Sequence, residues 1–246
     1  MAAPWLMVAD DSRKYLVKFA NERTDNSILS EVICARLAKK LDLPIPEWDF
    51  INIDQDMIDN TKDLTDRQIQ PGKHFASLFV DGSTNLPNDH FSIPINHIDN
   101  KNQIPGIIAF DTFVCNNDRK EANSLIAPLD DSREKYEYWM IDHGLCFGSH
   151  TWNEQSLDSL PMRPSGIPWN TDIISGSDSF EPFIEKLRKL DRNDFEEVVK
   201  IPTEWNHRQE DLSKLTETLV NRSEDQIINV LQGLHNSNDS VFRKWV

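Results

Sequence analysis

Patterns of apolar positions predict a strand-rich beginning to the chain. Residues 4–20 alternate around an Asp-Asp-Ser-Arg turn, which predicts a β-hairpin. From about residue 26 to residue 41 the apolar positions recur at helical spacing, and Asp25 or Asn26 would cap the resulting helix. The chain therefore opens with a strand pair followed by one helix.

Two more strands are predicted after this helix. Pro44 and Pro46 end the helix, and the apolar run behind them predicts a strand. Residues 73–80 predict another strand between turn-rich flanks. The place of this last strand in the chain suggests a position at a junction between two lobes, which we expect near residues 82–100.

The stretch from residue 107 to residue 148 carries the most informative pattern. It predicts a buried helix, a polar loop and two short strands, over residues 107–115, 116–123, 124–127 and 138–141 respectively. If the two strands pair, Asn123 and Asp142 lie at neighbouring points. Oxygen ligands placed in this way suit Mg²⁺.

The rest of the chain changes from irregular to helical. Residues 149–178 are polar with few regular signals, so this segment is either functional or flexible, although Trp152 and Trp169 could pack it against the core. Four helical patterns follow, over residues 182–190, 193–201, 211–222 and 224–235. The sequence Ile-Pro-Thr-Glu-Trp-Asn, beginning at residue 201, interrupts them.

Charge and cysteine usage narrow the function classes. The net charge of −15 argues against nucleic acid as the main ligand, because binding to a phosphate backbone needs a basic surface. Cys34, Cys115 and Cys146 have no metal-type or paired spacing, so we expect reduced core residues. The seven histidines also lack ligand spacing, and no zinc site is predicted.

The sequence has neither a secretory segment nor an apolar run long enough to span a membrane. We therefore expect a cytoplasmic protein without membrane contact.

Three polar residues suggest phosphoryl transfer. Asp118 and Asn123 are five residues apart in the polar loop, and Asp142 begins an Asp-His-Gly turn after an apolar strand. Asp and Asn at that separation are also common in ordinary loops, where they bond to nearby backbone. Adding Asp142 favours a site that holds a metal ion and a nucleotide.

The residues Asn-x-Asp-Arg-x-x-x-Asn, which end at Asn123, and the following Ile-Asp-His-Gly resemble HipA-like kinases and, more distantly, phosphoinositide kinases. Both belong to the protein-kinase-like superfamily. The resemblance implies that Asp118 is the catalytic base and that Asn123 and Asp142 are Mg²⁺ ligands. Lys120 departs from it, because many relatives have His there.

The same resemblance gives roles to Lys18 and Glu31. Lys18 would bind the nucleotide phosphates and Glu31, in the following helix, would pair with it. From the residues alone, Lys18 could instead lie on a solvated face, and Glu31 could be an acid that favours the amino end of a helix. Kinases also cover the phosphates with a glycine-rich turn, whereas the first glycine here is Gly72. Three explanations are open: the glycine-rich turn lies outside this chain, the start of this protein differs from that of its relatives, or the phosphates are held without such a turn.

The implied fold is α+β, a two-lobed protein-kinase-like arrangement with a β-rich amino lobe holding one helix and a mainly helical carboxyl lobe. We expect one kinase-like domain over residues 1–246, divided into lobes of residues 1–90 and 91–246. The implied activity is ATP- and Mg²⁺-dependent transfer to a serine or threonine of a protein substrate. Two alternatives remain: a kinase-fold module that binds nucleotide without turnover, and a small-molecule phosphotransferase. An antitoxin-like partner is implied by the resemblance alone.

Overall fold

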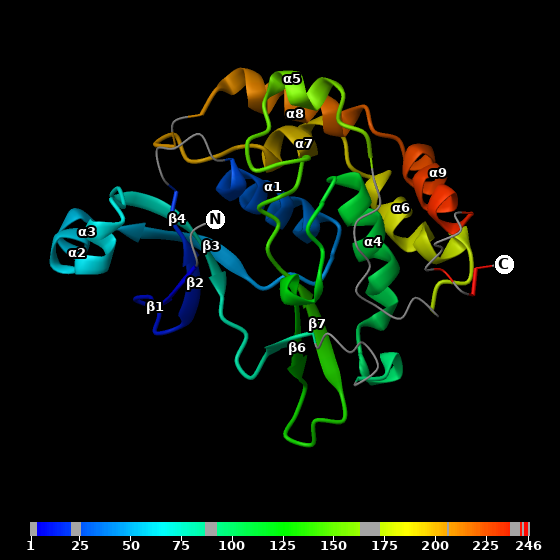
Figure 1. Cartoon of the computed structure of the whole chain (residues 1–246), viewed down its shortest axis with the longest axis horizontal. Coiled ribbons are helices and arrows are strands. Elements are labelled where there is room, and N and C mark those ends of the chain that lie inside the picture. Colours follow the sequence, from blue (N-terminus) through cyan, green and yellow to red (C-terminus); the bar gives the residue numbers. More distant parts are fainter. Residues whose placement is uncertain are drawn as a thin grey trace.

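A computed structural model describes residues 4–20, 26–86, 93–162, 173–205, 207–236, 242, 244 and 245. Figure 1 shows a sheet-rich part on one side of the molecule and a helical part on the other. The α+β arrangement predicted from the sequence, with a β-rich amino part and a mainly helical carboxyl part, is confirmed. The division at residue 90 falls outside the described residues and stays a prediction.

The sheet-rich part is a four-stranded antiparallel sheet. Its strands are β1 (Trp5–Val8), β2 (Lys14–Lys18), β3 (Trp48–Ile53) and β4 (Gly72–Leu78), in the order β1-β2-β4-β3. β1 and β2 form the predicted hairpin, in which Trp5 faces Val17 across the pair. β4 is an inner strand of the sheet because it pairs with β2 on one side and β3 on the other. Its middle residues, including Phe75 and Ala76, are buried.

Two short helices between β3 and β4 were not predicted. They are α2 (Gln55–Asn60) and α3 (Lys62–Asp66). Asp54 starts α2 by accepting a hydrogen bond of 2.7 Å from the backbone N–H of Met57. Each helix has fewer than two turns, too short to show a helical period in the sequence. The amino part therefore contains more than the one helix expected.

Helix α1 (Ser27–Lys40) lies between the sheet and the helical part (Figure 1). Ten of its 14 residues are buried, because it contacts β4 on one side and α7 on the other. Its span agrees with the prediction to within one residue at each end. Asn26 is the N-cap residue as expected, but its side chain makes no capping hydrogen bond and donates instead to the backbone oxygen of Trp152. Asp25 lies outside the described residues.

The centre of the carboxyl part is one buried helix beside a small antiparallel sheet. All ten residues of α4 (Ile104–Phe113) are buried. The sheet consists of β5 (Thr84–Asn85), β6 (Ser124–Pro128) and β7 (Tyr136–Met140), in the order β5-β6-β7. Pairing of Ser124 with Met140 sets the register. The predicted helix and both predicted strands are therefore present, whereas β5 was missed.

The remaining elements cover this centre. The longer helices are α5 (Glu154–Asp158), α6 (Glu181–Leu187), α7 (Arg192–Val198), α8 (Gln209–Val220) and α9 (Glu224–His235). Short 3₁₀ helices are η1 (Ile95–His97), η2 (Lys101–Gln103), η3 (Glu121–Asn123) and η4 (Ser177–Phe180). The four predicted carboxyl-terminal helices are present, and α5 lies in the segment expected to be irregular. Trp169 falls outside the described residues.

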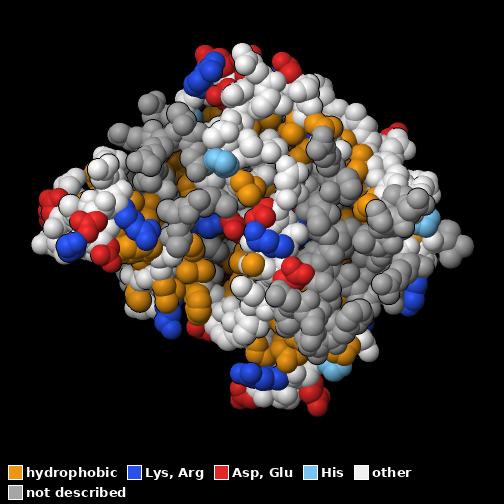
Figure 2. Space-filling view, viewed as in Figure 1, with side chains coloured by type: hydrophobic (Ala, Val, Ile, Leu, Met, Phe, Trp, Pro, Cys, Tyr) orange, Lys and Arg blue, Asp and Glu red, His pale blue; other side chains and the backbone are white. Residues whose placement is uncertain are grey.

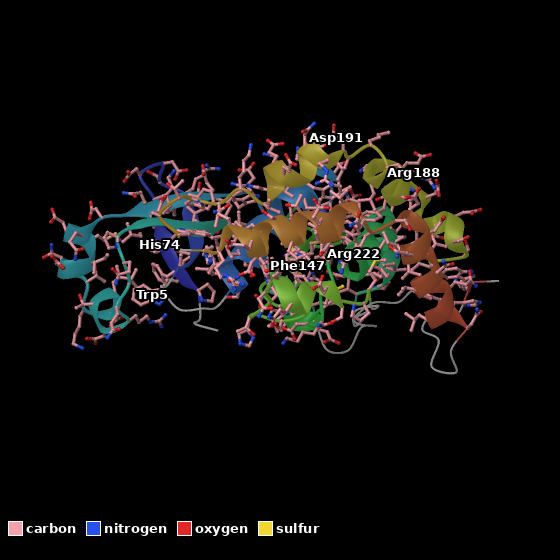
Figure 3. All side chains as sticks on the ribbon, turned by 90° about the horizontal axis from the view of Figure 1, so that it is seen from above. Trp5, His74, Phe147, Arg188, Asp191 and Arg222 are labelled. Atoms are coloured by element: carbon pink, nitrogen blue, oxygen red, sulfur yellow. The ribbon has the colours of Figure 1, made fainter. Side chains whose placement is uncertain are left out.

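One large hydrophobic core extends from α1 and β4 through the carboxyl helices, and a smaller one lies under the sheet. Trp205, from the Pro-Thr-Glu-Trp segment, joins the two parts by donating from Nε1 to the backbone oxygen of Lys73 at 2.8 Å. Figure 3 shows His74 and Trp5 in the sheet-rich part, and Phe147 and Arg222 among the helices. No helix in the described part of the chain is long and apolar enough to span a bilayer. The three cysteines are buried and form no disulfide.

The buried histidine of β4 makes stability sensitive to acid. His74 accepts from the backbone N–H of Ala20 at Nδ1, 3.0 Å, and its Nε2 bonds to the backbone oxygen of Gln70, 2.9 Å, which requires a neutral ring. Burial lowers the pKa of His74 below its usual value. The unfolded chain therefore binds the proton more readily, with a pKa of about 6.5, and stability falls as the pH drops below that value.

We expect the free energy of unfolding to fall between pH 7 and pH 5, by up to about 1.4 kcal/mol per pH unit for this one group. The His74→Gln variant, which has no proton to bind, should show a smaller pH slope in urea unfolding. An equal slope in both proteins would contradict this assignment.

Candidate active site

A cleft of about 760 Å³ lies between the sheet-rich and helical parts. Residues from β2, α1, β4 and the turn after β7 line it, and its charged side chains are Lys18, Glu31 and Asp142. Figure 2 shows hydrophobic side chains over the sheet-rich part and charged side chains gathered near the middle of this face. The predicted junction strand, β4, contributes Ser77 and Leu78, and the chain beyond it contributes Phe79 and Val80. The cleft is thus built from both parts of the molecule.

Lys18 is paired with both acids of the cleft. Strand alternation places it on the same face as Leu16, and both residues line the cleft. Its Nζ contacts Glu31 Oε1 and lies 2.9 Å from Asp142 Oδ1. Lys18 therefore does not lie on a solvated face, which the sequence had left open. Glu31 forms an ion pair with Lys18 and is not merely an acid that favours the amino end of a helix.

These contacts shift the ionisation of the cleft. Burial opposes the charged form of Lys18, but the two carboxylates outweigh it and raise its pKa. Burial also favours the neutral acid at Asp142, yet Lys18 keeps the pKa of Asp142 below its usual value. Glu31 is the most enclosed of the three, and burial raises its pKa. The site carries a protonated amine beside an ionised Asp142.

The backbone at Asp142 is specialised. Its φ of 59° lies in the left-handed region, which Asp and Asn tolerate better than most residues. One residue earlier, the backbone N–H of Ile141 donates to the backbone oxygen of Asn123 at 3.2 Å. The pairing of β6 with β7 therefore continues one residue beyond both strands and places the backbone of Asn123 beside Ile141, the residue before Asp142.

Asp118 and Asn123 are joined within the loop. Asn123 Nδ2 donates to the backbone oxygen of Asp118 at 2.6 Å and to its Oδ2 at 2.9 Å. Both partners are acceptors, which assigns the amide orientation. Asn123 Oδ1 accepts no hydrogen bond from any residue that the structure describes. Lys120 Nζ lies 2.8 and 2.9 Å from the two carboxylate oxygens of Asp118. Of this loop only Ala122 lines the cleft.

Arg119 supports this loop from the interior. The guanidinium is almost fully buried and forms a two-bond pair with Asp111 of α4, at 2.7 and 3.1 Å. It also donates to the backbone oxygens of Asn123 and Ile141. The Asp111 pairing raises the already high pKa of Arg119 despite burial. One cation thus connects α4, the loop and the strand that ends before Asp142.

Sequence reasoning missed this support. The available signal was Asp111, a single acid within an otherwise apolar helix, five residues before Asn116. Asn116 Nδ2 also bonds to Asp111, at 2.8 Å, and Asn116 Oδ1 accepts from the backbone N–H of Asp118 at 3.0 Å. A buried carboxylate is stable only when it is paired with a cation, and Arg119 is the arginine nearest to Asp111 in the sequence.

His143, the residue after Asp142, contacts the buried guanidinium of Arg119. Its Nε2 lies 3.0 Å from Arg119 Nη2. Because a guanidinium only donates, this nitrogen carries no proton. Burial first, and then Arg119 and Lys18, lower the pKa of His143 well below its usual value.

The residues present fit a magnesium ion held with a nucleotide. Asp142 supplies a carboxylate, and Asn123 supplies an amide oxygen without a partner in the described part of the chain. Within that part, no three His, Cys, Asp or Glu side chains converge on a metal-sized space. In nucleotide sites Mg²⁺ takes one or two protein oxygens and completes its shell with phosphates and water. Asn123 and Asp142 would hold the ion.

The far end of the cleft fits a nucleobase. Leu16, Phe75 and Leu78 give it apolar walls. The backbone N–H of Leu78 donates to Glu47 at 2.7 Å and that of Phe79 to Lys14 at 2.9 Å, whereas that of Val80 donates to no residue that the structure describes. An unpaired N–H in an apolar cleft suits the ring nitrogen of a base.

The Asp111–Arg119 pair should be essential for stability. Asp111→Asn leaves the Arg119 guanidinium buried without its counter-charge, so we expect a loss of about 3–5 kcal/mol in the free energy of unfolding. Urea denaturation measures this loss, and Asp131→Asn, at an exposed position, is the control. A loss of under about 1 kcal/mol, the size seen for an exposed pair, would argue against a buried support.

Comparison with known proteins places this chain in a family. No curated protein matches the sequence. Among solved structures, a Helicobacter pylori proinflammatory kinase, CtkA, superposes with a TM-score of 0.60 at 14% identity, covering 96% of this chain and 94% of that one, which shows a shared fold. The HipA-like kinase family matches residues 1–240. The chain therefore belongs to the HipA-like kinase family.

Proposed function

We propose that this protein transfers the γ-phosphoryl group of ATP, with Mg²⁺, to a serine or threonine hydroxyl of a protein. The observation that carries the proposal is the placement of Lys18 between Glu31 and Asp142 in the cleft. A protonated amine beside an ionised acid suits a polyphosphate and its metal ion. Family membership supports a kinase-type phosphotransferase, and the use of ATP and Mg²⁺ and the acceptor are the parts proposed.

The charged residues of the cleft and the neighbouring loop would then have separate roles. Lys18 would contact the phosphates, and Glu31 would hold the Lys18 side chain in place. The Asn123 and Asp142 oxygens would hold Mg²⁺, which neutralises charge on the phosphates when bound. The apolar end with the Val80 N–H would receive adenine. Positioning and charge neutralisation supply most of the rate in such reactions.

Asp118 would orient the acceptor hydroxyl. Its carboxylate is held by Asn123 on one side and by Lys120 on the other. Lys120 is the residue that departs from many relatives, and its side chain is about half exposed. An arriving hydroxyl must share Asp118 with this ammonium, which would then lie close to the transferred phosphoryl group and offset its charge.

The same contact favours a second candidate, a module that binds nucleotide without turnover. If Lys120 keeps both oxygens of Asp118, the hydroxyl has no acceptor for its proton, and the cleft binds ATP only. The two candidates share the nucleotide site and differ in the fate of the γ-phosphate.

The test uses ATP labelled at the γ-phosphate, with Mg²⁺, the protein itself and a serine- and threonine-containing peptide mixture as acceptors. Asp118→Asn should lower turnover roughly 10²–10⁴-fold, the size of a general-base contribution, with ATP affinity within a few-fold of the wild type. Lys18→Met should weaken ATP binding itself. Asp131→Asn, at an exposed turn, is the control and should match the wild type.

The outcomes separate the candidates. Label on serine or threonine supports the proposal, whereas Mg²⁺-dependent binding without transfer supports the binding module. Label on an added small alcohol but on no peptide would indicate a small-molecule phosphotransferase. Absence of ATP binding by the wild type would rule out all three.

A further inference from the structure

The amino end of α1 is attached to the segment that follows Asp142. The backbone N–H of Asn26 donates to the backbone oxygen of His150 at 2.6 Å, and Asn26 Nδ2 donates to that of Trp152 at 2.6 Å. Trp152 Nε1 in turn donates to Ser30 Oγ at 2.9 Å. We call these three hydrogen bonds the amino-end contacts. They join the helix that carries Glu31 to the chain that carries Asp142.

Trp152 is itself firmly placed. Its side chain is fully buried, and its ring meets Phe147 edge to face, with ring centroids 5.8 Å apart. The backbone N–H of Phe147 donates to the backbone oxygen of Val114, at the end of α4, at 2.7 Å. The indole is therefore fixed to the carboxyl core before it reaches Ser30.

The carboxyl end of α1 is attached to α7. Lys40 Nζ lies 2.9 Å from Asp194 Oδ1 and 2.6 Å from Glu197 Oε2. One turn earlier, the Arg36 guanidinium donates to the backbone oxygens of Val198 and Lys200, just where α7 ends. A cation at a helix carboxyl end pairs with carbonyl groups that have no partner in the helix. We call these bonds the carboxyl-end contacts.

Glu31 lies between the two sets of contacts and directly follows Ser30. A small rotation or shift of α1 would move its carboxylate away from Lys18, since a hydrogen-bonded ion pair tolerates little displacement. Lys18 belongs to β2 and Glu31 to α1, so the distance between their side chains depends on where α1 lies relative to β2. Besides its contact with β4, α1 is held at both ends by residues far away in sequence that belong to the carboxyl part.

We propose that Trp152 is a positioning residue: through Ser30 it holds α1 so that Glu31 stays in contact with Lys18 before any nucleotide arrives. Lys40 does the same at the other end of the helix. This role of Trp152 in function rests on the proposed kinase activity, because the Lys18–Glu31 pair binds phosphate only if the cleft holds ATP. A site assembled in advance does not spend binding free energy on ordering α1.

The experiment uses Cys34, a fully buried residue of α1, as a reporter. A maleimide reaches this thiol only when α1 leaves its place, so the labelling rate measures how often that happens. Trp152→Phe keeps an aromatic ring and removes the donor to Ser30. We expect Cys34 to be labelled roughly three- to tenfold faster in this variant, as for the loss of one buried hydrogen bond. Mass spectrometry of the peptides identifies the labelled cysteine.

The chain provides two controls. Cys115, which follows α4 and is also buried, should keep its wild-type labelling rate within about twofold if the change is local to α1. Trp139→Phe removes a buried indole N–H that has no partner in the described part of the chain, so the Cys34 rate should not change. If Trp152→Phe fails to fold, Ser30→Ala tests the same hydrogen bond from the other side.

Two results would overturn the inference. One is an unchanged Cys34 rate in both Trp152→Phe and Ser30→Ala. The other is an equal rise at Cys34 and Cys115, which would mean general destabilisation and no specific role at α1. Neither result depends on catalysis, so the labelling experiment holds even if the proposed kinase activity fails.

A kinetic measurement links the inference to that activity. In the double variant Trp152→Phe, Lys40→Met, α1 loses one side-chain contact at each end, so α1 is displaced in a larger fraction of the molecules and ATP binding must return it to its place. We expect the KM for ATP to rise roughly tenfold and kcat to change less than threefold, because the apparent affinity is reduced by the fraction of competent molecules. A fall in kcat with an unchanged KM would show that α1 does not govern nucleotide binding.

Discussion

The ammonium of Lys18 lies between two carboxylates that come from different parts of the molecule. Glu31 belongs to α1, and Asp142 follows β7 in the carboxyl part. A charge this enclosed is tolerated only with close partners, and removing one partner of a buried pair is far more costly than losing an exposed one. Lys18, Glu31 and Asp142 must therefore lie together in the cleft between the two parts. This requirement constrains how the sheet, α1 and the turn after β7 are placed relative to one another.

A second buried charge stabilises the side of the site that faces the carboxyl core. Arg119 links Asp111 of α4 with the backbone oxygens next to Asn123 and before Asp142. Both predicted metal ligands are thereby attached to a helix in which every residue is buried. Groups that stabilise a developing charge work best when they do not need to reorganise, and rigid support of this kind supplies that condition. The Arg119 network and the contacts of α1 act on opposite sides of the same cleft.

Most regular elements followed from local patterns. The hairpin, α1, the β6–β7 pair and the four carboxyl helices each show their own period in the sequence, and an amphipathic or buried element needs little more to be recognised. The misses were α2, α3, α5 and β5, which are too short to show a period. Some contacts of single residues also failed, as with Asn26, whose amide serves Trp152 instead of capping α1. Side-chain partners of that kind depend on segments more than a hundred residues away.

By itself, the sequence determined the order of the longer elements, the loop that carries Asp118 and Asn123, and the Asp-His-Gly turn that resembles the HipA-like kinases. These features reside in short stretches, where spacing alone limits which groups can be neighbours. Only the tertiary structure decided that Lys18 pairs with two acids at once, that His143 accepts from Arg119, and that Trp152 holds α1. Each of those contacts joins residues at least 13 positions apart, and chain folding, not local preference, brings such residues together.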